Sequence, residues 1–372
     1  MYHELSNSFI SISDPRDNNS KHKLIDILTI ATCAIICGAD TWTDIAQYGT
    51  SKQEWFSTFL ELNHGIPSHD TFGRVFSIIN PKEFQEAFIK WIKDISDKVT
   101  GDVIAIDGKT VRHSFDTSNN KSAIHMVSAW SNQLGLVLGQ IKVNDKSNEI
   151  TAIPELLDKI DINKSIVTID AMGTQKNIAK KIIKKGGDYV LALKGNHKNF
   201  SNDIKYFFEE ESKNKFADVE YSFFKTTNKD HGRIETRKHY LINDLNWLSQ
   251  KSEWKNLNSI IMVESERTIG DKTSKERRYY ISSLTENVEK VADAIRKHWG
   301  IENSLHWILD IAFREDDSRI RIENAAENFA ILRHIALNLL KNEKSVKIGV
   351  KAKRLKSGWD NDYLKKVLTS IQ

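Results

Sequence analysis

Two short apolar segments that each end in an aspartate constrain the fold of this chain more than any other feature. Residues 103–107 read VIAID and residues 165–170 read SIVTID. Short apolar runs of this kind are typical of buried strands. A carboxylate at the edge of a core is costly unless something binds it, so Asp107 and Asp170 both need partners. If the two strands are neighbours, the carboxylates can face each other and hold a hard divalent cation such as Mg²⁺.

Asp107 also has simpler interpretations. The motif DGKT, residues 107–110, is not a nucleotide-binding phosphate loop, because Val103 stands where that loop requires a glycine. An Asp-Gly pair is common in turns, so a solvated turn aspartate is the alternative to a metal ligand. Only partners from other parts of the chain can decide between the two.

Residues 20–100 have the apolar spacing of helices. Ser51 and Glu54 have the spacing of a capping box in front of a further helix. We expect Ser68 to cap a short helix and Pro81 to occupy the first position of the next one. A helix, a tight turn and a second helix can form a DNA-binding unit. An ordinary helical bundle fits the same pattern equally well.

The most apolar stretch predicts a core helix rather than a membrane span. Residues 24–39 are only 16 residues long and include Asp26, which is short for a membrane crossing. Cys33 and Cys37 lie in this stretch without further soft ligands nearby, so we expect them to be core residues. The N-terminus has no signal-like pattern, and we expect a cytoplasmic, nucleoid-associated protein with no membrane partner.

The charge of the chain is unevenly distributed. The formal net charge is +4, yet residues 1–100 carry 9 Lys and Arg against 13 Asp and Glu. Residues 341–372 carry nine Lys and Arg against three Asp and Glu. A basic C-terminal half suits a polyanionic partner. A solvated helix face is the more ordinary explanation of such a run.

From residue 101 onward the pattern changes to strands with intervening helices. The two runs at 123–130 and 136–143 flank a short turn and predict a hairpin. Residues 195–285 predict one helix, at about 198–213, followed by four strand-like runs. The remaining elements expected before this region are strands at 103–107, 165–170 and 188–193 and helices at 149–160 and 174–185.

A third carboxylate is expected on a helix that follows residue 285. Glu302, His306 and Asp310 are spaced by four residues and would share one helix face. Glu302 can complete a triad with Asp107 and Asp170. We expect His306 to be a hydrogen-bonded, partly buried histidine, with metal ligation as the alternative. The apolar residues expected to bury against the sheet are Trp299, Leu305, Trp307 and Ile308.

Together these motifs resemble a bacterial insertion-sequence transposase of the DDE type, and more narrowly the family of H-repeat-associated proteins. The resemblance runs from about residue 10 to residue 341. It is carried by AIDGKTVR (105–112), TIDAMGTQ (168–175), LALKGNH (191–197), HGRIETR (231–237) and HWGIENSLHWILDIAFRED (298–316).

The resemblance implies an α/β fold with an RNase H-like, retroviral-integrase-like catalytic core, a β-rich insertion and an N-terminal helical domain. We expect that helical domain at residues 1–100. DNA binding is one of the roles open to it. The first part of the core is expected at 101–194 and the insertion at 195–285. The C-terminal helices that complete the core are expected at 286–341, and a basic tail at 342–372.

Asp107, Asp170 and Glu302 stand where the family's catalytic triad falls. We expect Asp107 to bridge two Mg²⁺ ions, with Asp170 on one ion and Glu302 on the other, and Mn²⁺ to substitute. Neighbouring transposase families add a Tyr-x2-Arg-x3-Glu-x6-Lys signature. This chain has Ile295, His298 and Leu309 at those positions, so those contacts are absent in that form, and His298 is a candidate replacement for the arginine.

The implied partner is double-stranded DNA, both the terminal inverted repeats of the element and the target DNA. A homodimer is expected because two DNA ends must be paired. Arg233 and Arg237 would point to the same face of a regular strand, and the preceding His231 lies in the same segment. The candidate DNA contacts are Lys109, Lys194, Asn196, Arg233, Arg237, His298, Arg314 and Arg319.

Three functions remain open at this level. The first is an active transposase that cleaves DNA at the element ends and transfers the strands into a target. The second is a decayed or domesticated DNA-binding protein without catalysis. The third is an RNase H-like nuclease that cuts DNA without joining it.

Overall fold

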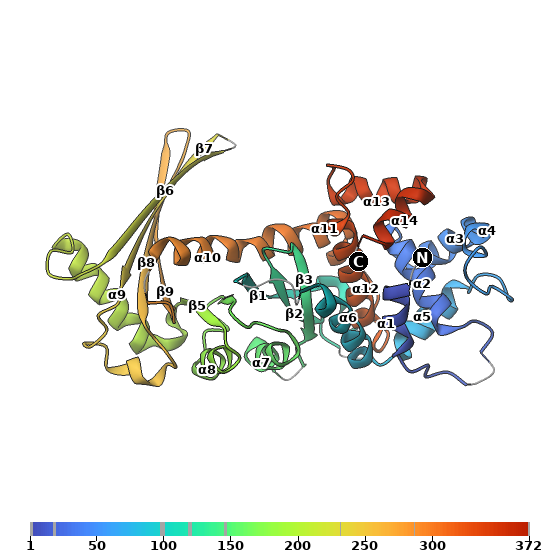
Figure 1. The fold of residues 1–372 in the computed structure, drawn as a ribbon, viewed down its shortest axis with the longest axis horizontal. Coiled ribbons are helices and arrows are strands. Elements are labelled where there is room, and N and C mark those ends of the chain that lie inside the picture. Colours follow the sequence, from blue (N-terminus) through green and yellow to red (C-terminus); the bar gives the residue numbers. More distant parts are fainter. Residues whose placement is uncertain are drawn as a thin grey trace.

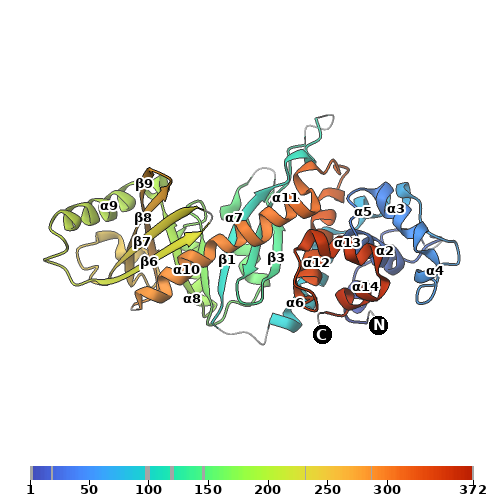
Figure 2. The ribbon, with the colours of Figure 1, turned by 90° about the horizontal axis from the view of Figure 1, so that it is seen from above.

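The fold is elongated, with helices at one end and a tall β-sheet at the other (Figure 1). A computed structural model describes residues 3–17, 20–96, 101–117, 121–144, 147–230, 232–285 and 287–370. A long helical segment runs along the molecule and joins the two ends (Figure 2).

The described strands form one nine-stranded sheet with the order β3-β2-β1-β4-β5-β9-β8-β7-β6. The strands are β1 (Val103–Thr110), β2 (His125–Ser131), β3 (Leu136–Lys142), β4 (Ile166–Ile169), β5 (Asp188–Leu193), β6 (Ser222–Asp230), β7 (Arg233–Ile242), β8 (Ser259–Ile269) and β9 (Lys272–Ser282).

The first five strands form the core of the sheet. β1, β2 and β3 pair as antiparallel neighbours, which confirms the predicted hairpin. β1, β4 and β5 are parallel. Parallel neighbours need crossover connections, and these contain α7 (Glu149–Lys159) and α8 (Lys176–Lys184). This arrangement is the RNase H-like core that the sequence led us to expect.

The β-rich region extends the same sheet instead of forming a separate one. β9 pairs in antiparallel fashion with β5, so that Leu191 lies opposite Ile281. The helix α9 (Lys198–Lys213) and the strands β6 to β9 lie where the sequence predicted a helix and four strands. The upper parts of β6 to β9 project beyond the body of the molecule as two long hairpins (Figure 1).

Helices cover both faces of the core sheet. Val103, Ile166 and Val190 lie on one face and pack against α10 (Val288–Ile301), which supplies Val291 and Ile295. The alternate residues of the same strands face the opposite side, where α7 and α8 lie (Figure 1). Side chains alternate along a strand, so this arrangement fixes which face each later residue of β1 and β4 occupies.

The remaining helices form the other end of the molecule. They are α1 (His3–Ile10), α2 (Leu24–Ile36), α3 (Trp42–Ser51), α4 (Gln53–Phe56), α5 (His69–Ile78), α6 (Pro81–Ser96), α11 (Trp307–Phe313), α12 (Ala325–Asn342), α13 (Val350–Trp359) and α14 (Asn361–Leu368). Short helical turns occur at Arg112–Ser114, Gly195–His197, Ser249–Glu253, Glu302–His306 and Glu315–Asp317.

Two of the predicted helix starts are confirmed and one is wrong. Ser68 caps α5 by accepting a hydrogen bond from the backbone of Thr71, and Pro81 begins α6. Ser51 is not a cap, because it is the last residue of α3. The capping box lies ten residues earlier, where Thr41 and Asp44 each accept a hydrogen bond from the other's backbone N–H group.

The apolar segment that contains Cys33 is a core helix, as predicted. Almost every residue of α2 is buried, and Asp26 is buried among them. Cys33 is fully buried, whereas Cys37 is only partly buried at the end of the helix. No helix in the described part of the chain is long and apolar enough to cross a membrane.

The basic segment after residue 341 folds back onto the body of the protein. Arg354 is buried, and its guanidinium donates hydrogen bonds to the carbonyl oxygens of Ile35 and Ala39 at the end of α2. It also lies over the ring of Phe313, with 4.3 Å to the centroid. Lys353 is buried and pairs with Glu343. These two cations therefore stabilise helix packing and are not part of a solvated tail.

Candidate active site

The two aspartates that end the apolar strands lie at equivalent positions of neighbouring strands. β1 and β4 are parallel and in register, with Ile106 opposite Ile169. Asp107 is the next residue of β1, which continues to Thr110 beyond its predicted end at residue 107, and Asp170 directly follows β4. The alternation that places Val103 on the α10 face places Asp107 on that face as well. The sheet therefore presents both carboxylates to the helix that carries Glu302.

The helix that carries Glu302 is not a regular α-helix at this point. Residues Glu302–His306 form a π-helical turn between α10 and α11. Such wider turns are rare and are frequent at functional sites. The simple spacing of four residues did not predict it.

Two of the residues expected to bury against the sheet are exposed instead. Leu305 is buried as expected, and Ile308 is partly buried. Trp299 is 41% exposed and Trp307 is 60% exposed. The prediction was wrong for the two tryptophans because it treated their hydrophobicity as sufficient, whereas Trp307 is mostly exposed and Trp299 borders an open cavity.

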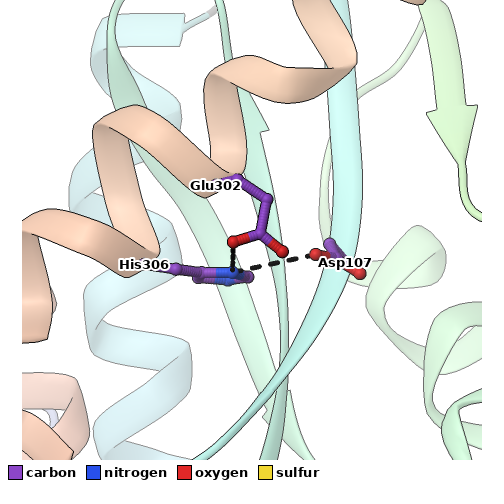
Figure 3. A group of neighbouring side chains, drawn as sticks. All are labelled: Asp107, Glu302 and His306. Atoms are coloured by element: carbon purple, nitrogen blue, oxygen red, sulfur yellow. Dashed lines mark ion pairs between the residues drawn. The ribbon is translucent and has the colours of Figure 1, made fainter. Parts of the chain in front are cut away.

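Glu302, His306 and Asp107 meet in one cluster (Figure 3). The Nδ1 atom of His306 lies 3.6 Å from Oε2 of Glu302 and 3.7 Å from Oδ2 of Asp107. One ligand atom from each of the three residues lies within 4.8 Å of the others. The strand and the helical turn thus bring together groups that are far apart in the sequence.

Asp170 lies on the same cavity but is held by its own loop. Its Oδ1 atom accepts hydrogen bonds from the backbone N–H groups of Met172, at 2.9 Å, and Gly173, at 3.2 Å. A cavity of about 540 Å³ is lined by Asp107, Asp170 and Glu302 together. The three predicted carboxylates therefore face one open space.

The electrostatics of this cavity favour a bound cation. Burial, together with the nearby carboxylates of Glu302 and Asp170, raises the pKa of Asp107 to about 8, although a hydrogen bond from the backbone of Gly108 lowers it. The contact with His306 holds the pKa of Glu302 below its ordinary value. A buried carboxylate with two acidic neighbours is stable in its charged form when a cation compensates it. The donor set of carboxylate oxygens suits Mg²⁺ or Mn²⁺.

Basic and aromatic groups border the cavity. Lys194 and Gly195 lie at one side, and Arg277 and Arg278 of β9 lie at another. Lys194 is exposed, and no ion pair to it occurs among the described residues. Arg278 lies over the ring of Trp299, 5.2 Å from its centroid. The two arginines were missed because the run RRYYISSL indicated only a strand, and the pairing of β9 with β5 was not predictable.

The other predicted residues near the cavity have structural partners. His298 also lines the cavity, and its Nδ1 atom lies 3.0 Å from the hydroxyl oxygen of Thr168. Burial lowers the pKa of His298. Asn196 donates a hydrogen bond from its side chain to the carbonyl oxygen of Ala171, which follows Asp170. Asn196 thereby holds the loop of Asp170 against the turn that carries Lys194.

Lys109 is paired with two carboxylates in this structure. Its Nζ atom lies 2.8 Å from Oδ1 of Asp310 and 2.9 Å from Oδ1 of Asp316. Burial alone would lower the pKa of Lys109, but Glu315, Asp310 and Asp316 together raise it. These ion pairs join β1 to the segment after α11, which gives Lys109 a structural role in this conformation.

Arg237 lines a second cavity between β6, β7 and α10. This cavity has a volume of about 390 Å³ and shares Ile295 and Trp299 with the first. Arg237 pairs with Glu235 at 2.6 Å. Burial is the main cause that lowers the pKa of Arg237, and the nearby positive charge of Arg233 also lowers it. His231 lies outside the described residues.

Arg314 and Arg319 lie apart from the three carboxylates. Both line a cavity of about 380 Å³ between the segment after α11 and the start of α3. Arg314 is exposed and pairs with Asp317 at 3.2 Å. They lie at the junction of the helical end and the core, and they do not line the cavity that contains the three carboxylates.

Comparison with known proteins agrees with this geometry. Residues 99–339 match the family described as "Transposase DDE domain", and residues 6–92 match the family described as "DDE_Tnp_1-associated". The chain is 46% identical over 353 residues to the protein named "H repeat-associated putative transposase YhhI" of Escherichia coli strain K12. The match covers 94% of this chain and 93% of that protein.

Two further matches differ in extent. A protein of the same strain named "Inactive transposase YbfQ" is 43% identical over 56 residues, which is 15% of this chain and 67% of that protein. A cryo-EM structure of a piggyBac transposase synaptic complex with hairpin DNA aligns over 99% of this chain and 76% of that chain. The TM-score is 0.42 at 10% sequence identity.

The sheet topology, the carboxylate-lined cavity and the matched sequence define a protein of the DDE transposase class. The chain belongs to the transposase DDE domain family, and the H repeat-associated proteins are its close relatives.

Proposed function

We propose that this chain is the transposase of a bacterial insertion sequence, which cleaves DNA at the element ends and joins the strands to a target. The observation that supports this proposal is the convergence of Asp107, Asp170 and Glu302 on one cavity. The carboxylates come from β1, the end of β4 and the π-helical turn. In a member of this family, such a set has the chemistry that phosphodiester transfer needs.

The three carboxylates would hold two Mg²⁺ ions, which Mn²⁺ can replace. When bound, the ions would stabilise the attacking oxygen, the leaving oxygen and the negative charge of the transition state. Asp107 is central because it is near both other carboxylates, each of which raises its pKa. The hydrogen bonds that Asp170 accepts from its own loop fix one carboxylate oxygen and leave the other available.

The basic groups around the cavity would hold the DNA backbone. Lys194 is the strongest candidate because it is exposed at the cavity and no ion pair compensates it among the described residues. Arg277 and Arg278 each pair with a glutamate, at 2.9 Å and 2.8 Å, so they would have to exchange that partner for a phosphate. Arg233 and Arg237 on β7, and Arg314 and Arg319 near α3, are proposed as more distant DNA contacts.

The protein would act as a homodimer on two terminal inverted repeats, within the bacterial cytoplasm and on the nucleoid. The N-terminal helices at 1–100 are proposed to contribute to DNA binding. The core would comprise residues 101–194 and 286–341, with the insertion at 195–285. The segment 342–372 would contribute mainly through its exposed lysines, because Lys353 and Arg354 are buried.

Strand transfer from a pre-nicked element end tests the proposal. Purified protein is incubated with Mg²⁺, a labelled duplex that already carries a free 3′-hydroxyl at the element end, and target DNA. We expect joined products with the unmodified protein and none with Asp107→Asn, while both proteins bind the duplex. Cleavage of an intact duplex in a parallel reaction, without joining of the pre-nicked end, would indicate a nuclease. Binding without cleavage or joining would indicate a DNA-binding protein that has lost catalysis.

A further inference from the structure

His306 is a buried histidine that lies against two carboxylates and has an unpartnered ring nitrogen. The residue is 6% exposed. Its Nε2 atom has no hydrogen-bond partner among the described residues. A buried histidine whose only role is structural normally has its polar atoms paired. The position of this side chain therefore needs another explanation.

The distances around His306 are too long for hydrogen bonds. Nδ1 lies 3.6 Å from Glu302 and 3.7 Å from Asp107, whereas a hydrogen bond to oxygen has a length of about 2.7–3.2 Å. Two atoms that are each bonded to one cation at about 2.1 Å can lie up to about 4.2 Å apart. The separations of Nδ1 from both oxygen atoms thus suit ligands of a shared cation.

We propose that His306 is a protein ligand of one of the two divalent cations, together with Asp107 and Glu302. This inference rests on the proposed function. It adds that the two cations would have different protein ligands. The cation between Asp107 and Asp170 would have only oxygen atoms from the protein. The cation between Asp107, Glu302 and His306 would have an imidazole nitrogen as well.

The π-helical turn supports this assignment. It contains both Glu302 and His306 and interrupts an otherwise continuous helix from α10 to α11. Figure 3 shows that both side chains point from this turn toward Asp107 on β1. A local departure from α-helical geometry that gathers possible ligands is what a binding site requires, and helix packing alone does not require it.

An imidazole ligand changes which metal the site prefers. Mg²⁺ prefers oxygen ligands. Mn²⁺ also accepts oxygen ligands, and it is the first member of the series of divalent transition metals whose affinity for a given site with nitrogen ligands increases along the series. Loss of the imidazole should therefore weaken the binding of Mn²⁺ more than that of Mg²⁺. Removal of groups that support a metal site commonly costs 10- to 100-fold in affinity, and we expect at least about tenfold for Mn²⁺ in His306→Gln.

Pulsed electron paramagnetic resonance of bound Mn²⁺ tests the proposal without any measurement of activity. A directly bound imidazole gives a nitrogen coupling to the metal, and growth with ¹⁵N-labelled histidine changes the frequency of that coupling. The matched control is His298→Gln, because His298 is a nearby histidine that lines the cavity and is hydrogen-bonded to Thr168. Each variant is first compared with the unmodified protein by circular dichroism.

We expect the coupling in the unmodified protein and in His298→Gln, and its loss in His306→Gln. Loss in His298→Gln alone would overturn the proposal, as would Mn²⁺ binding without any histidine coupling in the unmodified protein. The labelled unmodified protein decides this second point even if His306→Gln does not fold. If the histidine coupling is absent while metal-dependent cleavage is intact, His306 is rejected as a ligand and the proposed function remains in place. Absence of both metal binding and cleavage would reject the two together.

Discussion

His306 on the π-helical turn and Asp107 on β1 face each other across 3.7 Å, although the two residues lie 199 positions apart in the sequence. The contact exists because the helix after the insertion returns to the face of the sheet on which β1 presents its carboxylate. Glu302 joins them from the same turn. The carboxylate-lined cavity is therefore assembled at the contact between the sheet and this helix, and changes to either side should alter it in defined ways.

The stability of the metal-free protein should decrease as the pH rises. Burial raises the pKa of Asp107 to about 8 from an ordinary value of 3.8. The folded state then binds a proton that the unfolded state has released, so stability is present below about pH 4 and is lost as the pH rises through about 8. We expect the melting temperature in EDTA to fall across this window. Asp107→Asn should flatten the slope, and an unchanged slope would contradict the assignment.

Loss of Lys194 should weaken DNA binding through charge alone. Lys194→Ala removes one exposed cation at the cavity, so the slope of log K against log salt should decrease in magnitude by about 1. Lys180→Ala is the control, because Lys180 is exposed on α8 outside the cavity. Binding titrations at several salt concentrations measure both slopes. Equal slopes for the two variants would show that Lys194 does not contact a phosphate.

Arg354 should affect stability more than DNA binding. Arg354→Met removes the guanidinium that donates to the carbonyl oxygens of Ile35 and Ala39, and we expect a loss of about 2–4 kcal/mol in the free energy of unfolding. Lys351→Met, on the exposed side of α13, should change the free energy of unfolding by less than about 0.5 kcal/mol. Urea denaturation measures both values. A similar effect of the two substitutions would mean that Arg354 is not a packing residue.

The position of the capping box can be tested in the same way. Thr41→Ala should cost about 1 kcal/mol, because Thr41 accepts a hydrogen bond from the backbone of Asp44 at the start of α3. Ser51→Ala should have little effect, since Ser51 ends that helix. The reverse order of the two effects in urea denaturation would restore the interpretation based on sequence spacing.

The carboxylate cavity was predictable because its first two members follow from local patterns. An apolar strand that ends in an aspartate needs only one neighbour of the same kind for the pair to meet, and β1 and β4 are such neighbours. Glu302 followed from helical spacing together with a family resemblance. The π-helical turn did not, because the sequence around Glu302 fits a regular α-helix equally well.

The parts that the sequence did not predict depend on contacts between distant segments. The pairing of β9 with β5 brings Arg278 to the cavity, and no local pattern reports that pairing. Lys109 follows Asp107 by two residues, but its ion pairs are with Asp310 and Asp316, which are distant in the sequence. The capping box was misplaced because Thr41 and Ser51 both begin acceptable motifs, and only the packed helices distinguish them.

The most direct test of the account is cleavage and joining of a labelled duplex that carries an intact end of the element. The reaction is run with Mg²⁺ and with EDTA, for the unmodified protein and for Glu302→Gln. The account predicts nicked and joined products only for the unmodified protein with Mg²⁺, and a loss of at least about a thousandfold in the variant, because bound metal supplies several kcal/mol of transition-state stabilisation. Equal cleavage by Glu302→Gln, or cleavage that persists in EDTA, would contradict it.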